Sequence, residues 1–271
     1  MSDRTDLIYR YDGSLAGLLT CVFESIACKE APAAILSPDD MEGYLLPEKE
    51  IFTDEVKARR VAVSIPKKIS PAAWDLVWRG YLTCHSDKAR LIVDFLRLGY
   101  KVGGKVVDML GDETVSALSK AVLHMNREAH LLSGFIRFSI HDDVMTAVIA
   151  PKNSVLPLLA PHFRTRYPDD SFMIFDKTHG MAYFHTAREE CFKMVDELQL
   201  PPVSAEEMRF RQMWKRYYDT IAIEGRYNPR CRMTHMPKRY WECMTELNPE
   251  YTGMSAERSL TDGSFRDRAD V

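Results

Sequence analysis

Residues 136–150, IRFSIHDDVMTAVIA, mark the point at which the chain changes from a helical to a β period. Apolar residues occupy every second position from Ile136 to Ile140, as in a strand with one buried face. Residues 141–143 are a histidine and two aspartates that suit a turn, and a β-prone run follows at 144–150. This stretch therefore predicts a β-hairpin in the middle of the chain.

Helical periods surround this hairpin on both sides. Upstream, Ser14 is a candidate N-cap for a helix with one apolar face, and further helices are expected to open at residues 70–71, 86–87 and 112. Short strands are expected at residues 8–11, 61–65, 172–175 and 181–184, a loop at residues 30–60, and helices at about 154–163 and 204–222. Strands grouped between helical blocks predict an α+β fold, in which helical blocks flank a small, mostly antiparallel sheet.

The same pattern predicts four regions along the chain. They are an N-terminal strand–helix region at 1–85, a central α+β region at 86–203, a basic aromatic helical segment at 204–250 packed on the same domain, and a tail at 251–271. The tail is polar and has no pattern, so it is expected to be disordered.

Composition narrows the classes of protein. The net charge of -3 and pI of about 6.3 argue against a basic coat over the whole surface. With no apolar leader and no run of about 20 apolar residues, the sequence predicts a cytoplasmic protein with no membrane contact. The six cysteines form no C-x-x-C pair. His124 and Glu128 share a helix face but His130 lies on another side, so we expect no metal site and no cofactor.

Four stretches carry a family resemblance. They are Tyr11-Asp12-Gly13-Ser14 with the following Leu18-Leu19 and Val22-Phe23, Glu128-Ala129-His130 with residues 134–138, residues 156–163 (LPLLAPHF), and residues 236–241 (MPKRYW). In their order and spacing they resemble a bacterial family described as DNA metabolism or DNA repair proteins and built on a domain of unknown function.

The resemblance implies a partner. Members of that family are often encoded beside a DNA-repair protein of the radical S-adenosylmethionine type, and similar domains are fused to uracil-DNA-glycosylase-like domains. The present sequence lacks the C-x-x-x-C-x-x-C cluster motif of the radical enzyme. The resemblance therefore implies that the chain is the partner of the radical enzyme.

A basic segment with interleaved aromatic residues lies between Ser204 and Trp241. Nine basic and four acidic residues give it a net charge of +5, which leaves −8 for the rest of the chain. Basic surfaces with aromatic platforms hold single strands or flipped bases. The residues that we expect to contact nucleic acid are Arg226, Arg230, Arg232, Lys238, Arg239, Tyr240 and Trp241.

Packing explains the first part of this segment at least as well as binding does. One face of the helix there holds Phe210, Met213, Trp214, Tyr217 and Ile221. We expect that face to pack inward and the neighbouring basic residues to be solvated. In the later part, two prolines interrupt the chain, and we expect Trp241 to point inward while Lys238 and Arg239 stay available to phosphate.

His130, Arg137 and His162 are the candidates for catalysis. A helix end, a hairpin strand and the next helix would bring them into one cleft with Glu128, where the histidines would act as acid and base. Arg137 faces away from the apolar side of its strand and needs an anion, either a phosphate or a buried partner such as Glu128 or Asp176. Each histidine is equally compatible with a capping or packing role.

Three functions stay open at this stage. The first is an accessory protein that binds single-stranded or damaged DNA and works with the radical S-adenosylmethionine protein. The second is an enzyme that acts on a damaged base or a phosphate through His130, Arg137 and His162. The third is a protein-interaction subunit that only stabilises the radical enzyme.

Overall fold

The computed structural model describes residues 3–40, 43, 45–141 and 143–248. It divides into two compact units, unit 1 from Met1 to Arg127 and unit 2 from Glu128 to Val271, so the boundary falls within helix α5 (Glu113–Phe135). Both units combine helices with a small sheet, so the expected α+β class is confirmed. The tail expected at 251–271 lies outside the described residues. None of the described helices combines the length and the apolar character needed to cross a membrane.

Unit 1 is built on a three-stranded parallel sheet with the order β2-β1-β3. Its strands are β1 (Ile8–Arg10), β2 (Ala34–Leu36) and β3 (Glu48–Glu50). Tyr9 in the central strand pairs with Ile35 on one side and Lys49 on the other. Two of these strands lie in the region that the sequence predicted as a loop, because each is only three residues long and too short to show a period.

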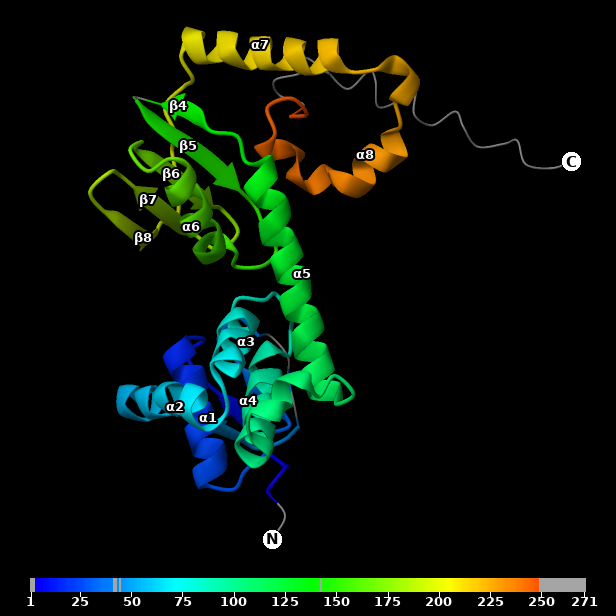
Figure 1. Ribbon diagram of the computed structural model, residues 1–271. Helices are drawn as coiled ribbons and strands as arrows, with labels where there is room; N and C mark the ends of the chain where they lie inside the picture. Colours follow the sequence, from blue (N-terminus) through cyan, green and yellow to red (C-terminus); the bar gives the residue numbers. More distant parts are fainter. Residues whose placement is uncertain (1–2, 41–42, 44, 142, 249–271) are drawn as a thin grey trace, which may run out of the picture. The chain divides into compact units, whose positions relative to one another are not determined.

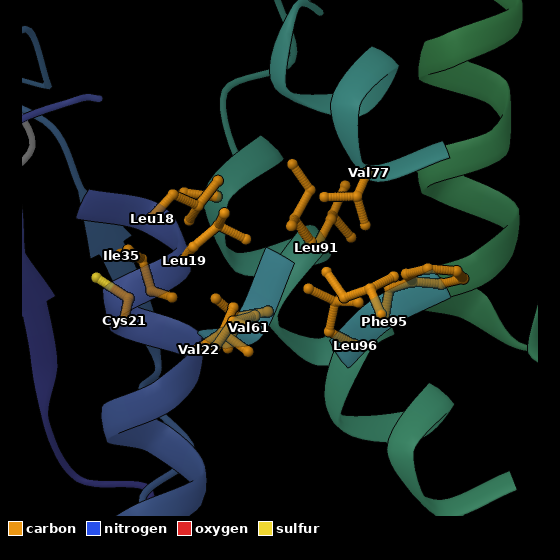
Figure 2. Packing of buried hydrophobic residues seen from close by; sticks show 14 of the residues in the cluster. Leu18, Leu19, Cys21, Val22, Ile35, Val61, Val77, Leu91, Phe95 and Leu96 are labelled. Atoms are coloured by element: carbon orange, nitrogen blue, oxygen red, sulfur yellow. The ribbon is translucent and has the colours of Figure 1, made fainter. Parts of the chain in front are cut away.

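Helices supply most of the core of unit 1, to which α5 adds Val115 and Leu118. The other helices are α1 (Leu15–Ala27), α2 (Glu55–Lys68), α3 (Pro71–Tyr81) and α4 (Lys88–Val102), and the 3-10 helix η1 (Gly103–Asp108) follows. Figure 2 shows apolar side chains of α1, α2, α3 and α4 packing together, among them Leu19, Val61 and Phe95. The Ser14 hydroxyl accepts a hydrogen bond from the Gly17 N–H at 2.9 Å, which confirms the predicted start of α1.

The strand predicted at residues 61–65 is wrong, because these residues belong to α2. The carboxylate of Asp54 caps that helix by accepting from the N–H groups of Val56 and Lys57 at 2.9 and 3.0 Å. The β-branched residues Val61 and Ile65 then fall one helical turn apart, and both are buried.

Unit 2 contains a five-stranded sheet with the order β4-β5-β6-β7-β8. The strands are β4 (Ser139–His141), β5 (Val144–Ile149), β6 (Phe172–Asp176), β7 (Met181–His185) and β8 (Glu190–Met194). Strands β5 and β6 are parallel and the other three pairs are antiparallel, so the predicted hairpin and the mostly antiparallel sheet are confirmed. Helix α6 (Leu156–Arg166) connects the parallel pair and contacts β7 (Figure 1).

The C-terminal part of unit 2 is helical. It contains α7 (Ala205–Ile221), α8 (Pro229–His235) and the 3-10 helices η2 (Glu224–Arg226) and η3 (Lys238–Cys243). Ser204 caps α7 by accepting from the Glu207 N–H at 3.1 Å, as the sequence predicted. The Glu207 side chain binds Arg211, at 2.8 Å, so it is part of the packing beneath α7.

Candidate nucleic-acid interface

A cluster of cationic and aromatic side chains occupies α8, η3 and the segments beside them. The guanidinium carbon of Arg232 lies 5.6 Å from the centre of the Tyr227 ring and 5.4 Å from that of Trp241. Lys238 Nζ lies 5.8 Å from the Trp241 ring centre. We call this cluster and its neighbours the cation–aromatic surface. It consists of Arg226, Tyr227, Arg230, Arg232, Lys238 and Trp241.

Two local features fix this surface. The Asn228 side chain accepts from the Cys231 N–H at 2.9 Å and starts α8, and Pro229 follows at the first helical position, where its missing N–H has no cost. The indole N–H of Trp241 donates to the Met236 carbonyl at 2.9 Å. This bond holds the half-buried Trp241 ring beside the Arg232 guanidinium.

The positive charges of the surface are not neutralised by the part of the chain that the structure describes. Arg226, Arg230, Arg232 and Lys238 form no ion pair with a described carboxylate, unlike their neighbour Arg239. The Arg232 Nε is also buried and has no hydrogen-bond partner among the described atoms. A guanidinium held between two rings without a counter-ion is suited to an anion from outside, because charged hydrogen bonds to phosphate are strong.

Tyr240 is buried in unit 2, and the exposed Arg239 pairs with the buried carboxylate of Glu128. Tyr240 is 1% exposed, and its hydroxyl donates to Glu128 Oε1 at 3.1 Å. The Arg239 guanidinium stacks 4.5 Å from the Tyr240 ring centre and lies 3.4 Å from the same carboxylate oxygen. Tyr240 is therefore the buried aromatic residue of η3, in the place where we expected Trp241, and Arg239 is already paired within the protein.

Glu128 is the acceptor at the centre of this buried cluster. Its carboxylate accepts from the Asn153 N–H at 2.8 Å, the Asn153 side-chain amide at 2.6 Å and the Lys152 N–H at 3.2 Å. Burial by itself raises the pKa of Glu128, but these hydrogen bonds and the one from Tyr240 outweigh it and hold the pKa below its usual value. Burial and the negative charge of Glu128 raise the pKa of Tyr240 to about 12. At pH 7 the Glu128 carboxylate is therefore ionised and the Tyr240 hydroxyl is neutral.

A groove of about 1050 Å³ lies beneath α7. Its lining comes from the end of α5, the β4–β5 hairpin, the end of α6 and α7 itself. Aromatic side chains that line it are Phe138, Phe163, Tyr167, Phe210, Trp214 and Tyr217, and basic ones are Arg137, Arg166 and Arg211. We refer to it as the α7 groove.

Buried ion pairs hold the walls of the α7 groove. Arg211 donates to Glu207 at 2.8 Å and to the Ser139 hydroxyl at 2.6 Å, which ties α7 to β4. Glu246, 3% exposed, accepts from Arg137 at 2.8 Å and from the Trp214 indole N–H at 2.9 Å. Side chains from the α5–β4 connection and from α7 therefore meet at one carboxylate of the C-terminal segment.

The apolar face of α7 does not pack inward, contrary to the expectation from its sequence. Phe210, Met213, Trp214, Tyr217 and Ile221 are 51, 58, 40, 54 and 56% exposed. The buried side chains of α7 are the paired Glu207 and Arg211. The Glu207–Arg211 ion pair occupies the side of α7 that faces the β4–β5 hairpin. The apolar residues that recur at helical spacing therefore form a stripe on the surface of α7.

The three candidate catalytic residues contact different partners in the structure. Arg137 binds Glu246, and so its partner is a buried carboxylate but neither Glu128 nor Asp176. His162 is exposed and makes an edge contact with the Phe163 ring at 4.9 Å, and His130 is exposed at the surface of α5. Within the described residues, no hydrogen bond or ion pair joins either histidine to Arg137. Nor do these residues include any group of three or more potential metal ligands.

Sequence reasoning missed the buried partners of these side chains. Glu246 carries no motif, and the only signal for it was that Arg137 needs an anion. Asn153, whose side chain binds Glu128, carries no motif either. These partners are far apart in sequence, so only the fold brings them together.

Comparison with known proteins gives one family match. A family described as "Domain of unknown function (DUF4130)" matches residues 86–246, which include the last part of unit 1 and nearly all of the described part of unit 2. No curated protein matches the chain.

Proposed function

The chain belongs to the family of the domain of unknown function DUF4130, and we propose that it is an accessory protein of DNA metabolism or repair that binds single-stranded or damaged DNA. The matched region contains the cation–aromatic surface and the α7 groove. The proposal includes a cytoplasmic location and a radical S-adenosylmethionine protein as the working partner.

One observation carries the proposal. The Arg232 guanidinium lies between the Tyr227 and Trp241 rings without a carboxylate among the described residues, and Lys238 stands beside Trp241. Nucleic acid offers both of the missing contacts, because its phosphates neutralise the cations and its bases stack on exposed rings. Tyr227, which is 69% exposed, is free for such stacking.

The partner part of the proposal depends on the family resemblance of the sequence. The radical enzyme would perform the chemistry, and this chain would hold the DNA. The three candidate catalytic residues make no joint site in the described contacts, which favours this division of roles over an enzyme acting through them.

A salt-dependent titration tests DNA binding. We expect labelled single-stranded DNA to bind, with an affinity that falls as salt rises. The double variant Arg232→Gln/Lys238→Gln should bind more weakly and reduce the slope of log K against log salt by about 1.4, the value for two phosphate contacts on a single strand. Absence of binding at low salt, to both single-stranded and duplex DNA, would falsify the proposed function.

A matched control is available on α7. Lys215 is basic but already bound to Asp219 at 2.6 Å, so Lys215→Gln should leave the affinity and the salt slope unchanged. Co-purification with the radical enzyme tests the partner, with and without nuclease. Association that survives nuclease shows direct contact, and association lost on nuclease treatment shows that DNA bridges the two proteins.

A further inference from the structure

Trp214 and Tyr217, two of the aromatic residues that line the α7 groove, are 40 and 54% exposed. Trp214 and Tyr217 stack on each other with ring centres 5.7 Å apart and an angle of 29° between their planes. Phe210 on the same helix is about half exposed. Exposed aromatic surface of this extent is unfavourable in water, and contiguous patches of it mark binding sites.

The groove is also cationic. Three arginines line it against one lining carboxylate, Glu207, which is bound to Arg211. Arg166 has no carboxylate partner among the described residues, and its guanidinium lies 5.7 Å from the centre of the Tyr167 ring. The free charge of the groove is therefore positive and sits beside an aromatic ring.

The groove adjoins the segment that carries the cation–aromatic surface. The backbone N–H of Arg137, which lines the groove, donates to the carbonyl of Cys243 at the end of η3 at 3.1 Å. The Phe135 ring lies 5.7 Å from the Tyr240 ring. Thr245, two residues beyond η3, lines the groove itself. One extended strand would therefore meet both sites within unit 2.

We propose that the α7 groove holds an unstacked nucleobase of the single strand whose phosphates lie on the cation–aromatic surface. The inference rests on the proposed function and adds the place and the form of recognition. The base stacks against Tyr217 and Phe210, and Arg166 contacts the phosphate next to it. A volume of about 1050 Å³ admits a nucleotide with its neighbours, since ligand sites of small molecules occupy about 300–1,000 Å³.

An apolar helix of a partner protein is the competing occupant. It would cover the exposed stripe of α7, but it offers no anion to Arg166 unless an acidic residue lies at that point. A nucleotide provides both a flat ring and a negative charge in one ligand. Exposed aromatic side chains beside an arginine that has no carboxylate partner among the described residues therefore favour nucleic acid.

Two DNA oligonucleotides of equal length and charge distinguish contacts to bases from contacts to phosphates. One is a twelve-nucleotide oligothymidine, and the other has the same phosphate backbone with abasic sites throughout. We expect the full-length protein to bind oligothymidine about 5-fold to 100-fold more tightly, the range for stacking one base. Tyr217→Ala and Phe210→Ala should each reduce this ratio severalfold and leave the affinity for the abasic strand unchanged.

Tyr217 is the preferred position because it is 54% exposed and no hydrogen bond of its hydroxyl is seen among the described residues. Phe192→Ala, which removes a 46% exposed ring from β8 outside both sites, is the matched control and should not change the ratio. Circular dichroism melting curves confirm that each variant folds.

The outcomes are distinct. If both strands bind and the ratio is unchanged in Tyr217→Ala and Phe210→Ala, the groove inference is overturned and the proposed function stands. If Tyr217→Ala instead loses the radical enzyme while the ratio is unchanged, the groove is a protein-docking surface and the inference is also overturned. If neither strand binds to the unaltered protein at low salt, the proposed function and the inference fail together.

Discussion

Glu128→Gln is the most informative single change in unit 2. Glutamine keeps the shape of glutamate but replaces one acceptor oxygen by an NH2 donor. Oε2 accepts two bonds from Asn153, and Oε1 accepts from Lys152 N–H and Tyr240 and pairs with Arg239. The amide nitrogen should take the Oε1 position, because the Tyr240 hydroxyl can turn to become an acceptor. The Lys152 N–H then has no acceptor.

The expected loss follows from these contacts. Leaving the partly buried Lys152 N–H without an acceptor and placing an NH2 group beside Arg239 together cost about 1–3 kcal/mol, and weakening the two charged hydrogen bonds from Asn153 adds about 1 kcal/mol. The free energy of unfolding of unit 2 should therefore fall by about 2–4 kcal/mol at pH 7.

Urea unfolding of the full chain measures this loss. Pulsed hydrogen exchange on peptides of unit 2 gives their midpoint, which should fall by roughly 1–2 M at an unchanged slope. Glu242→Gln is the control, because Glu242 forms an exposed ion pair with Lys177 at 2.7 Å and should cost at most about 0.5 kcal/mol. A loss below about 1 kcal/mol for Glu128→Gln would show that the buried carboxylate does not organise this cluster.

The other predictions concern acid, helix α1 and the basic residues of η3. Hydrogen bonds hold the pKa of Glu128 below its usual value, so the stability that its carboxylate contributes is complete above about pH 4.3 and is lost as the pH falls through the native pKa. Acid should therefore destabilise unit 2 of the unaltered protein more than unit 2 of Glu128→Gln. Urea midpoints at pH 3 and pH 7 measure this difference. Gly17→Ala should cost about 1–2 kcal/mol in thermal unfolding of unit 1, since a Cβ there would lie 2.2 Å from Asp12 Oδ1, and an unchanged melting temperature would contradict this. Arg239→Ala should lower the free energy of unfolding by about 1–2 kcal/mol, because its contacts with Tyr240 and the buried carboxylate are lost. Lys238→Ala should change the free energy of unfolding by at most about 0.5 kcal/mol and should weaken DNA binding. The reverse pattern would exchange the roles of the two residues.

Local signals predicted the elements that local contacts determine. Caps at Ser14 and Ser204 were readable because the capping side chain lies three residues from its donor. At residues 61–65 the β-branched composition suggested a strand, but Ala58, Val61 and Ile65 are buried at helical spacing after the cap at Asp54. The helical period was present in the sequence, and the alternation of three apolar residues obscured it.

Other features depend on contacts that no local pattern encodes. Strand β8 is exposed at every residue, so it lacks the alternation that identifies a half-buried strand. On α7 the buried positions belong to Glu207 and Arg211, whereas the apolar residues beside them are exposed. In η3 the choice between Tyr240 and Trp241 as the buried ring depends on Glu128, which lies 112 residues away from Tyr240.

The basic residues of unit 2 divide by their counter-ions. Arginines bound to a buried carboxylate are Arg137 with Glu246, Arg211 with Glu207, and Arg239 with Glu128. Removing one of these arginines leaves a buried carboxylate without its cation, so these arginines determine the fold of the site and respond in stability measurements. The cations of the cation–aromatic surface have no such partner among the described residues, and therefore their charge is available to a ligand. The net charge of a segment does not distinguish paired arginines from available cations. The positions of the carboxylates in the fold distinguish them. On this ground the nucleic-acid contacts should include Arg226, Arg230, Arg232 and Lys238, and Arg239 and Tyr240 should support them from beneath.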